Sequence, residues 1–373
     1  MWLRRRTPGS QCVKVLFVDN PFSRPTDGGG YTFQQLLLGG LKRMHSRHDC
    51  SYVQPEAHKG VVQALVQRNQ IDFVWFISLY HESVPVPFAS TVWDLGHREM
   101  PWFPELSLSG WTFQQREQHY REVLPRASLI AVGNAVGAQA IQQFYRIPAE
   151  RICEIALPVD TATLAAVPAD AAAVQELGLV PGRYLLYPAQ FWPHKNHITL
   201  IDMLALLNAS GRPMKLVLSG SDKGNRDYVE QYVRQRGLQE SVLFTGFIES
   251  KCLYQLYRHA FAMVFASLMG PDNLPPLEAM ALDCPVVCGA FSGAREQLGD
   301  AALLFPPLDA AAAANCVAQL EDSQLRRRLC ERGRAVVAGR SPDDYVRRIN
   351  DALDAFAAQR RLWAGGDTYR HPS

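Results

Sequence analysis

SLMGPDNLPPLEAMALDCPVV, residues 267–287, joins a turn-rich loop, a short helix and a strand, and this order is the strongest indication of the fold. The turn-forming residues Gly270–Asn273 precede a predicted helix that begins with two prolines, which lose no hydrogen bond in a first turn. A β-branched apolar run ending at Val287 follows as a strand. Such a helix N-terminus carries free N–H groups and partial positive charge, so it favours an anionic or hydroxyl-rich ligand. The stretch therefore predicts a ligand site in an α/β fold, with Glu278 as its carboxylate.

Short apolar runs alternate with segments of helical period along the whole chain. The predicted strands are residues 13–18, 73–77, 89–93, 129–132, 184–187, 215–218, 242–244, 262–265, 285–287 and 302–305. This alternation predicts parallel sheets covered by helices on both faces. We expect two Rossmann-like domains, over residues 1–160 and 176–341, with the Ala- and Pro-rich stretch 158–181 as the crossing between them. Ligands bind at the carboxyl ends of such strands, so the motifs should meet in one cleft.

Composition excludes several classes of protein. The 373 residues, 47% of them hydrophobic, suffice for two cores. Near balance between 38 Lys+Arg and 36 Asp+Glu argues against a nucleic-acid binder. The sequence lacks Asp-x-Asp, His-Glu-x-x-His and Walker A motifs, which disfavours metal-dependent transferases, zinc hydrolases and P-loop kinases.

Scattered cysteines and the lack of a long apolar run predict a cytoplasmic protein. The eight cysteines form no C-x-x-C pair, and free thiols suit a reducing compartment. No apolar run reaches the roughly 18–20 residues that span a bilayer. Trp2 with Arg4–Arg6 offers a peripheral contact with the inner face of the membrane, against the simpler interpretation of a solvated terminus.

Leu274–Ala281, LPPLEAMA, resembles the donor-sugar motif of the retaining GT-B glycosyltransferases of family 4, in which seven residues separate two glutamates. Glu278 matches the second glutamate, which in that family binds both ribose hydroxyls of the donor. Gly270 stands in place of the first glutamate, so this half of the motif departs from the pattern. The resemblance implies a GT-B fold, with a C-terminal helix over residues 342–359 that crosses back to the first domain.

A second match follows the first strand of the second domain. Lys195 and Asn196 match the Lys-Asn of a family loop that binds the nucleotide diphosphate, but Gln190 stands where the family has arginine. The resemblance implies that Lys195 neutralises the diphosphate as a point charge. Arg24 and Arg295 are candidates for a second cation, and a surface lysine without function is the alternative interpretation.

Other positions complete the expected donor site. Gly220 and Gly246 lie in turns that resemble the family's nucleobase segments, although plain strand-to-helix turns explain them equally well. Asp272 and Asn273 are the substitutes for the missing glutamate at the sugar hydroxyls. Gly29 and Gly30 resemble the loop through which the backbone approaches phosphate and acceptor, and the stretch 102–111 adds to the acceptor side.

His97 follows the third predicted strand of the first domain, residues 89–93. Asp94–His97 resembles the family's His-Asp-Leu segment, with Trp93 at the first His position, so His97 is the candidate for contacting the donor sugar. A structural histidine is the alternative. Asp49, 19 residues after Gly30, gives a weaker dinucleotide-binding interpretation.

The sequence thus predicts a retaining, metal-independent glycosyltransferase that acts on a nucleoside-diphosphate sugar and a glycan or lipid-linked glycan acceptor, without a cofactor. Bacterial surface polysaccharide assembly is the context that the resemblance implies. A GT-B nucleotide-sugar epimerase and a catalytically silent sugar-nucleotide-binding subunit remain the alternatives. The expected catalytic residues are His97, Lys195 and Glu278, and the expected donor-binding residues are Gly29, Gly30, Gln190, Lys195, Asn196, Gly220, Gly246, Asp272, Asn273, Leu274 and Glu278.

Overall fold

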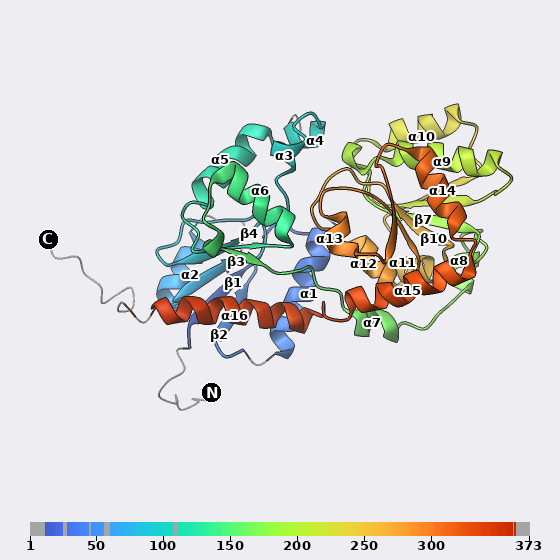
Figure 1. The fold of residues 1–373 in the computed structure, drawn as a ribbon. Coiled ribbons are helices and arrows are strands. Elements are labelled where there is room, and N and C mark those ends of the chain that lie inside the picture. Colours follow the sequence, from blue (N-terminus) through green and yellow to red (C-terminus); the bar gives the residue numbers. More distant parts are fainter. Residues whose placement is uncertain are drawn as a thin grey trace.

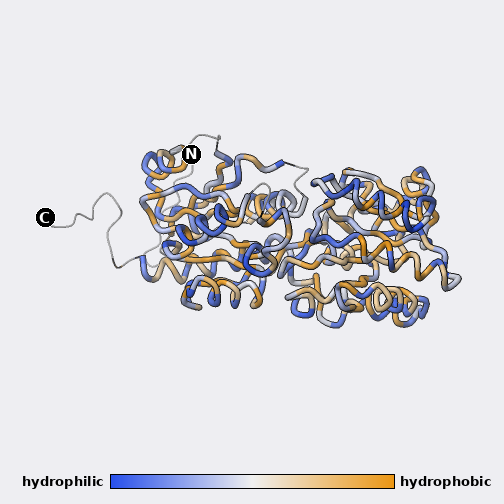
Figure 2. The backbone as a smooth tube through the Cα atoms, turned by 90° about the horizontal axis from the view of Figure 1, so that it is seen from above, coloured by the Kyte–Doolittle hydropathy of each residue, from blue (hydrophilic) through white to orange (hydrophobic). Residues whose placement is uncertain are grey.

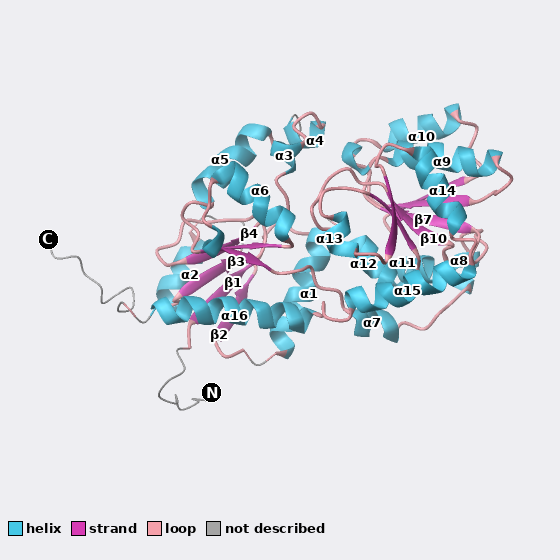
Figure 3. Cartoon of the chain, in the orientation of Figure 1, coloured by secondary structure: helices cyan, strands magenta, loops and turns pink. Residues whose placement is uncertain are grey.

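A computed structural model describes residues 12–24, 28–44, 46–55, 60–107, 111–360 and 362. Two six-stranded parallel sheets lie side by side, each between layers of helices (Figures 1 and 3). The strand order is β2-β1-β3-β4-β5-β6 in the first sheet and β12-β11-β10-β7-β8-β9 in the second. The predicted α/β architecture of two parallel sheets is confirmed.

The first sheet contains two strands that the sequence analysis missed, β2 and β6. Its strands are β1 (Lys14–Val18), β2 (Asp49–Val53), β3 (Phe73–Phe76), β4 (Phe88–Thr91), β5 (Leu129–Val132) and β6 (Ile152–Glu154). Its helices are α1 (Gly29–Arg43), α2 (Val61–Asn69), α3 (Gly96–Glu99), α4 (Pro104–Ser107), α5 (Phe113–Val123) and α6 (Ala135–Tyr145), with a 3₁₀ turn η2 (Ala149–Arg151). Both missed strands are sheet edges with no buried residue, so they lack the apolar pattern that marks the central strands.

The second domain starts earlier in the chain than expected. Its strands are β7 (Tyr184–Pro188), β8 (Lys215–Ser219), β9 (Val242–Gly246), β10 (Ala262–Phe265), β11 (Val286–Gly289) and β12 (Ala302–Phe305). Its helices are α7 (Thr161–Ala166), α8 (Ala172–Gln175), α9 (His197–Ala209), α10 (Arg226–Gln235), α11 (Ser250–His259), α12 (Leu274–Ala281), α13 (Ala294–Leu298), α14 (Ala310–Gln319) and α15 (Ser323–Val337), with a 3₁₀ turn η3 (Pro193–Lys195). Helix α7 packs on α12 and α8 packs on α11, because Leu164 and Val174 belong to this domain's core. The stretch 158–181 therefore crosses between the domains only at its beginning.

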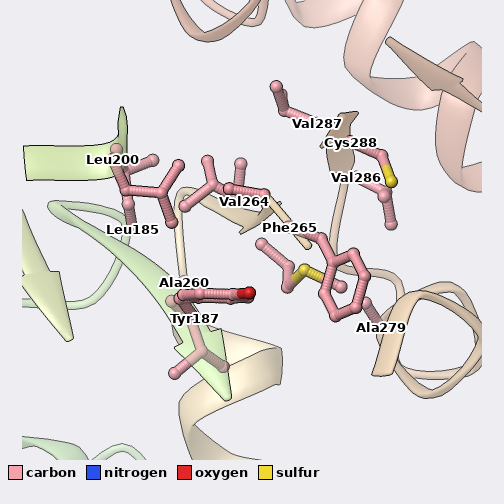
Figure 4. Packing of buried hydrophobic residues seen from close by; sticks show 14 of the residues in the cluster. Leu185, Tyr187, Leu200, Ala260, Val264, Phe265, Ala279, Val286, Val287 and Cys288 are labelled. Atoms are coloured by element: carbon pink, nitrogen blue, oxygen red, sulfur yellow. The ribbon is translucent and has the colours of Figure 1, made fainter. Parts of the chain in front are cut away.

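The cores lie on both faces of each sheet. Central strands read as continuous apolar runs because helices cover both of their faces, and Figure 2 shows hydrophobic segments alternating with hydrophilic ones along the tube. In the second domain Leu185, Val264 and Val287 of three adjacent strands pack with Leu200 of α9, and Ala279 of α12 approaches Phe265 (Figure 4). This core fixes where α12 begins, and so where Glu278 stands.

The last helix, α16 (Pro342–Arg360), lies against the first domain, as Figure 1 shows. Its apolar residues Val346, Ile349 and Leu353 join Phe33 and Leu37 of α1 in one buried cluster. Their spacing of three and four residues is that of one helix face. The crossing helix expected from the family resemblance is therefore present.

Of the described helices, none is both long and apolar enough to cross a membrane. Trp2 and Arg4–Arg6, the expected membrane contact, lie outside the described residues.

Candidate functional site

A cleft of about 610 Å³ lies between the two domains, at the carboxyl ends of the strands of both sheets. The first domain contributes the loops after β1, β4 and β5, and the second domain contributes those after β7, β8, β9 and β10. Nine of the predicted site residues line this cleft: Gly29, Gly30, Gln190, Lys195, Gly220, Asp272, Asn273, Leu274 and Glu278. Sequence motifs that are up to 249 positions apart therefore meet in one place.

Lys195 ends the turn η3 on the floor of the cleft. Its Nζ lies 3.3 Å from Ser267 Oγ and 5.7 Å from the ring centre of Phe265, both at the end of β10. Burial lowers the pKa of Lys195 to about 8, against the carboxylates of Asp94 and Glu105, which raise it. A largely desolvated ammonium group is available to an anionic ligand in the cleft, and bringing an anion to it recovers the electrostatic cost of its burial.

Glu278 lies just past the middle of α12 and faces the same cleft. Its Oε2 accepts a hydrogen bond of 3.0 Å from the hydroxyl of the buried Tyr257 on α11. Burial raises the pKa of Glu278, although the Tyr257 hydroxyl opposes this effect. Tyr257 holds one oxygen of the carboxylate, which leaves acceptor capacity for ligand hydroxyl groups.

The loop before α12 is held by Gln297 of α13. The Gln297 amide donates to the Asn273 carbonyl (2.7 Å) and to Asp272, and its oxygen accepts the Asn273 N–H (3.2 Å). Asn273 uses its own side-chain amide on the carbonyl of Gly270 (3.2 Å). The Asn273 side chain is therefore committed to shaping the loop.

Asp272 keeps one oxygen unpaired. Its Oδ2 has no hydrogen-bond partner, and it packs against Gly133 of the first domain. Burial raises the pKa of Asp272 to about 7, against Arg340 and neighbouring hydrogen bonds, which lower it. Asp272 is thus the carboxylate nearest in sequence to the position where Gly270 removes one.

The start of α12 offers fewer donors than the sequence analysis assumed. Pro275 and Pro276 have no N–H, and the N–H of Asn273 is already bonded to Gln297. Three of the four N–H groups that a helix start normally leaves free are therefore missing or already bonded.

The start of α1 on the opposite wall retains its donors. Gly28 has φ +70° and turns the chain into the helix, and the first bond within the helix comes from Thr32 N–H to the Gly28 carbonyl (3.1 Å). The N–H groups of Gly29, Gly30 and Tyr31 precede that bond, in a first turn without acidic residues. A Cβ on Gly30 would lie 2.9 Å from the ring of Trp93, so this close approach requires glycine.

Gln190 lies opposite Gly28 of the first domain. A Cβ on Gly28 would lie 3.6 Å from the Gln190 side chain, whose amide donates to Ser221 Oγ (3.1 Å) and accepts from Trp192 Nε1 (3.0 Å). Beside it, Gly220 N–H donates to the carbonyl of Gly246 (2.9 Å). The hydrogen bonds of Gln190 to Ser221 and Trp192 thus stay within the second domain, at a position where an arginine would bring charge.

Three predicted site residues do not line the cleft. The His97 ring is fully buried, stacks on Tyr120 at 16° and has Nε2 3.4 Å from Glu117 Oε2. Asn196 stabilises the neighbouring backbone, since its side-chain amide donates hydrogen bonds to the carbonyls of Ala266 (3.3 Å) and Pro307 (2.7 Å). Gly246 is the last residue of β9, and its carbonyl accepts the hydrogen bond from the Gly220 N–H. A role of His97 at the donor sugar has no support in this geometry.

Asp49, Arg24 and Arg295, for which the sequence suggested weaker roles, do not line the cleft either. Asp49 begins β2, opposite Lys14, and so lies at the amino end of the strands, away from the cleft. Among the described residues that line the cleft, the cationic side chains are Lys195 and Arg43, so Arg24 and Arg295 are not part of this lining. Arg43 is bonded to Asp343 (3.0 Å).

Several cleft residues were not among the predicted site residues. Trp93, Phe247, Ile248 and Tyr254 line the cleft. Trp93 ends the predicted strand 89–93 and Phe247 lies three residues after the predicted strand 242–244, a signal that could have placed them there. Tyr254 lies on α11, and only the packing of α11 beside α12 brings it to the site.

Within the part of the chain that the structure describes, no group of three or more His, Cys, Asp or Glu side chains could hold a metal ion. Metal independence remains a prediction.

Residues 174–336 match the family described as Glycosyl transferases group 1. This match spans most of the second domain. The matched stretch includes Gln190, Lys195, Gly220, Asp272 and Glu278, which line the cleft from the second domain.

Known proteins extend the similarity beyond this domain. O-antigen chain mannosyltransferase B from Escherichia coli is 31% identical over 223 residues, which are 59% of this chain and 58% of that protein. The chain thus spans less than two thirds of that relative. HepE from Anabaena, solved with UDP-glucose, superposes with a TM-score of 0.72 at 20% identity, over 92% of this chain and 99% of HepE. WaaG, a glycosyltransferase involved in lipopolysaccharide biosynthesis, gives 0.67 at 17% identity, over 91% and 99%. The fold is therefore GT-B.

Proposed function

We propose that this protein is a retaining, metal-independent glycosyltransferase of surface polysaccharide assembly, which moves a sugar from a nucleoside diphosphate to an acceptor hydroxyl. The meeting of Lys195, Glu278 and the start of α1 in one cleft carries this proposal. The E. coli relative, named an O-antigen chain mannosyltransferase, supports a mannosyl donor and a glycan or lipid-linked glycan acceptor.

Glu278 would fix the donor by its ribose. A carboxylate accepts hydrogen bonds from two vicinal hydroxyl groups, and Tyr257 holds this one in place without using all of its acceptor capacity. Phe247, Ile248 and Tyr254, on the same wall, would lie along the nucleoside.

The leaving diphosphate would lie between the two domains. Lys195 would neutralise it from the second domain, and the N–H groups of Gly29, Gly30 and Tyr31 would bind it from the first. As the bond from the sugar C1 to the phosphate oxygen breaks, charge develops on the diphosphate, where these groups already point. With α12 short of donors at its prolines, the start of α1 takes the larger part of this task.

The acceptor would approach from the first domain, around 28–31 and the segment 102–111, of which residues 108–110 lie outside the described structure. Its hydroxyl oxygen would bond to C1 on the face that the diphosphate leaves, and its proton would pass to a diphosphate oxygen. Attack on that face retains the configuration at C1. Trp102, with 70% of its surface exposed, offers an apolar contact for a glycan or a membrane surface beside the cleft.

A catalytically silent subunit that binds sugar nucleotides is the second candidate, favoured by Gly270 and Gln190 at positions where the family has charged residues. An assay of nucleoside diphosphate release from UDP- and GDP-linked sugars, with lipid-linked glycan acceptors and EDTA, separates the two candidates. We expect acceptor-dependent release that Lys195→Ala and Glu278→Ala abolish, and a product whose anomeric proton in NMR shows retention. Binding without release in every combination would favour the silent subunit. No binding of any nucleotide would overturn both candidates.

A further inference from the structure

Glu105 of the first domain contacts the second domain immediately beside Lys195. It lies on α4, 6% exposed, and its Oε1 accepts hydrogen bonds from the backbone N–H of His194 (3.0 Å) and from His194 Nδ1 (2.6 Å). His194 directly precedes Lys195 in the turn η3. Two hydrogen bonds to one carboxylate oxygen hold this turn from the opposite domain.

Hydrogen bonds within the second domain also hold the turn η3. The Tyr187 hydroxyl donates to the Lys195 carbonyl (2.7 Å), and the Leu268 N–H donates to the His194 carbonyl (2.9 Å). These contacts fix the backbone within its own domain. The contact with Glu105 depends on the two domains being closed against each other.

The charges of the pair follow from its burial. Burial by itself raises the pKa of Glu105, but the hydrogen bonds from His194 outweigh it and leave that pKa below its usual value. Burial and the nearby Lys195 lower the pKa of His194, against Glu105 and Asp94. A neutral imidazole therefore donates to an ionised carboxylate, and the pair carries one negative charge next to the lysine.

Lys195 faces titratable groups from both domains. Asp94, after β4, and Glu105, on α4, are acidic and favour its charged form. His194 and His197 flank it in its own domain, and burial lowers the pKa of His197 to about 3, so that ring is neutral. Both carboxylates that keep Lys195 protonated thus belong to the first domain, whereas the lysine belongs to the second.

We propose that Glu105 is a positioning residue for Lys195: it fixes the lysine's turn through His194 and, with Asp94, keeps the ammonium group charged across the domain boundary. For the role of Lys195 as the diphosphate ligand, this inference rests on the proposed function. Closure of the domains then does two things at once, because it orders the diphosphate-binding turn and sets the charge on its cation. Glu105 itself does not line the cleft and need not touch the donor.

The direct test follows the titration of Lys195 by NMR in protein labelled with ¹³C at lysine. The chain has seven lysines, and Lys195→Arg assigns the signal. In the unaltered protein we expect a midpoint near pH 8. Glu105→Gln keeps the size and one acceptor oxygen but removes the charge, so the midpoint should move to lower pH. An unchanged midpoint in Glu105→Gln overturns the proposal.

Glu117→Gln is the matched control. Glu117 is also a first-domain carboxylate, 8% exposed, next to a buried histidine, but it pairs with Arg98 and Arg121 within its own domain. Its substitution should lower the melting temperature at least as much as Glu105→Gln and leave the Lys195 midpoint in place. A midpoint that moves equally in both variants assigns the effect to general loosening and also overturns the proposal.

A second measurement, the affinity for UDP and GDP by calorimetry between pH 6 and pH 8.5, separates this inference from the proposed function. At a pH below the lysine midpoint, Lys195 is charged in both proteins. Any difference in nucleotide affinity at that pH therefore reflects only the changed position of the turn η3. We compare the ratio of the dissociation constants of the Glu105→Gln variant and the unaltered protein at each pH. This ratio should be roughly two- to five-fold larger at pH 8 than at pH 6. A ratio that is constant with pH contradicts the proposal. If neither nucleotide binds the unaltered protein, the proposed function fails, and the lysine titration still decides the role of Glu105.

Discussion

Replacement of Glu278 by glutamine should move donor affinity and protein stability in opposite directions. Glutamine keeps an acceptor oxygen for the Tyr257 hydroxyl but loses the charge that the ribose hydroxyls would meet. A hydrogen bond to a charged group contributes about 1.5–3 kcal/mol, so losing one weakens nucleotide binding about 10-fold or more. Calorimetry with UDP, GDP, dTDP and ADP measures this loss for the nucleotide that binds.

Stability should rise because burial of the Glu278 charge costs free energy. The pKa of Glu278 is raised in the folded state, so its contribution to stability is fully present below the unfolded pKa and is lost as the pH rises through the folded pKa. Glutamine has no ionised form, so the variant does not lose this stability as the pH rises. At pH 7.5 we expect a gain on the order of 1 kcal/mol, or about 1–3 °C in the melting temperature, and near pH 4 almost none.

The two readouts together distinguish function from helix stabilisation. Glu230→Gln on α10, whose carboxylate pairs with Arg226 at the surface, is the control and should change neither affinity nor the pH dependence of melting. Nucleotide affinity within two-fold of the unaltered protein would refute the ribose contact. A melting temperature that falls at pH 7.5 would show that the ionised carboxylate of Glu278 stabilises the fold instead.

Three further substitutions test residues that hold the cleft and the first domain in shape. Gly220→Ala would drive a Cβ into the backbone carbonyl of Ala189, so we expect a loss of about 2–4 kcal/mol in unfolding free energy and of nucleotide binding; denaturant melts that match the unaltered protein would contradict this. Leu353→Ala empties a fully buried position of α16, and urea unfolding should show a loss of about 2–5 kcal/mol if this helix holds the first domain together. Asp272→Asn removes a carboxylate whose pKa is raised to about 7, so the variant should gain melting temperature relative to the unaltered protein as the pH rises from 5 to 8; a difference that does not change with pH would show that the carboxylate titrates normally.

Local patterns were sufficient wherever a residue's role follows from its own neighbours in the chain. The central strands are predictable because burial on both faces requires continuous β-branched and aromatic runs, as in Phe73–Phe76 and Ala262–Phe265. Glu278 and Lys195 were predicted because their motifs resemble those of family 4, and both motifs follow strands whose carboxyl ends meet at one edge of the sheet.

The tertiary structure decided which of these residues face the cleft and which serve the core. His97 follows a strand just as Lys195 does, yet α3 turns its ring toward Tyr120 and Glu117, and no local pattern records that direction. The contact between Glu105 and His194 joins residues 89 positions apart in different domains, so it exists only when two separately folded sheets close on each other. The sequence by itself determined the two sheets and the edge where their loops gather, since apolar periodicity is a local property. The charge on Lys195 and the direction of His97 depend on burial by distant residues, and only the folded chain brings those residues together.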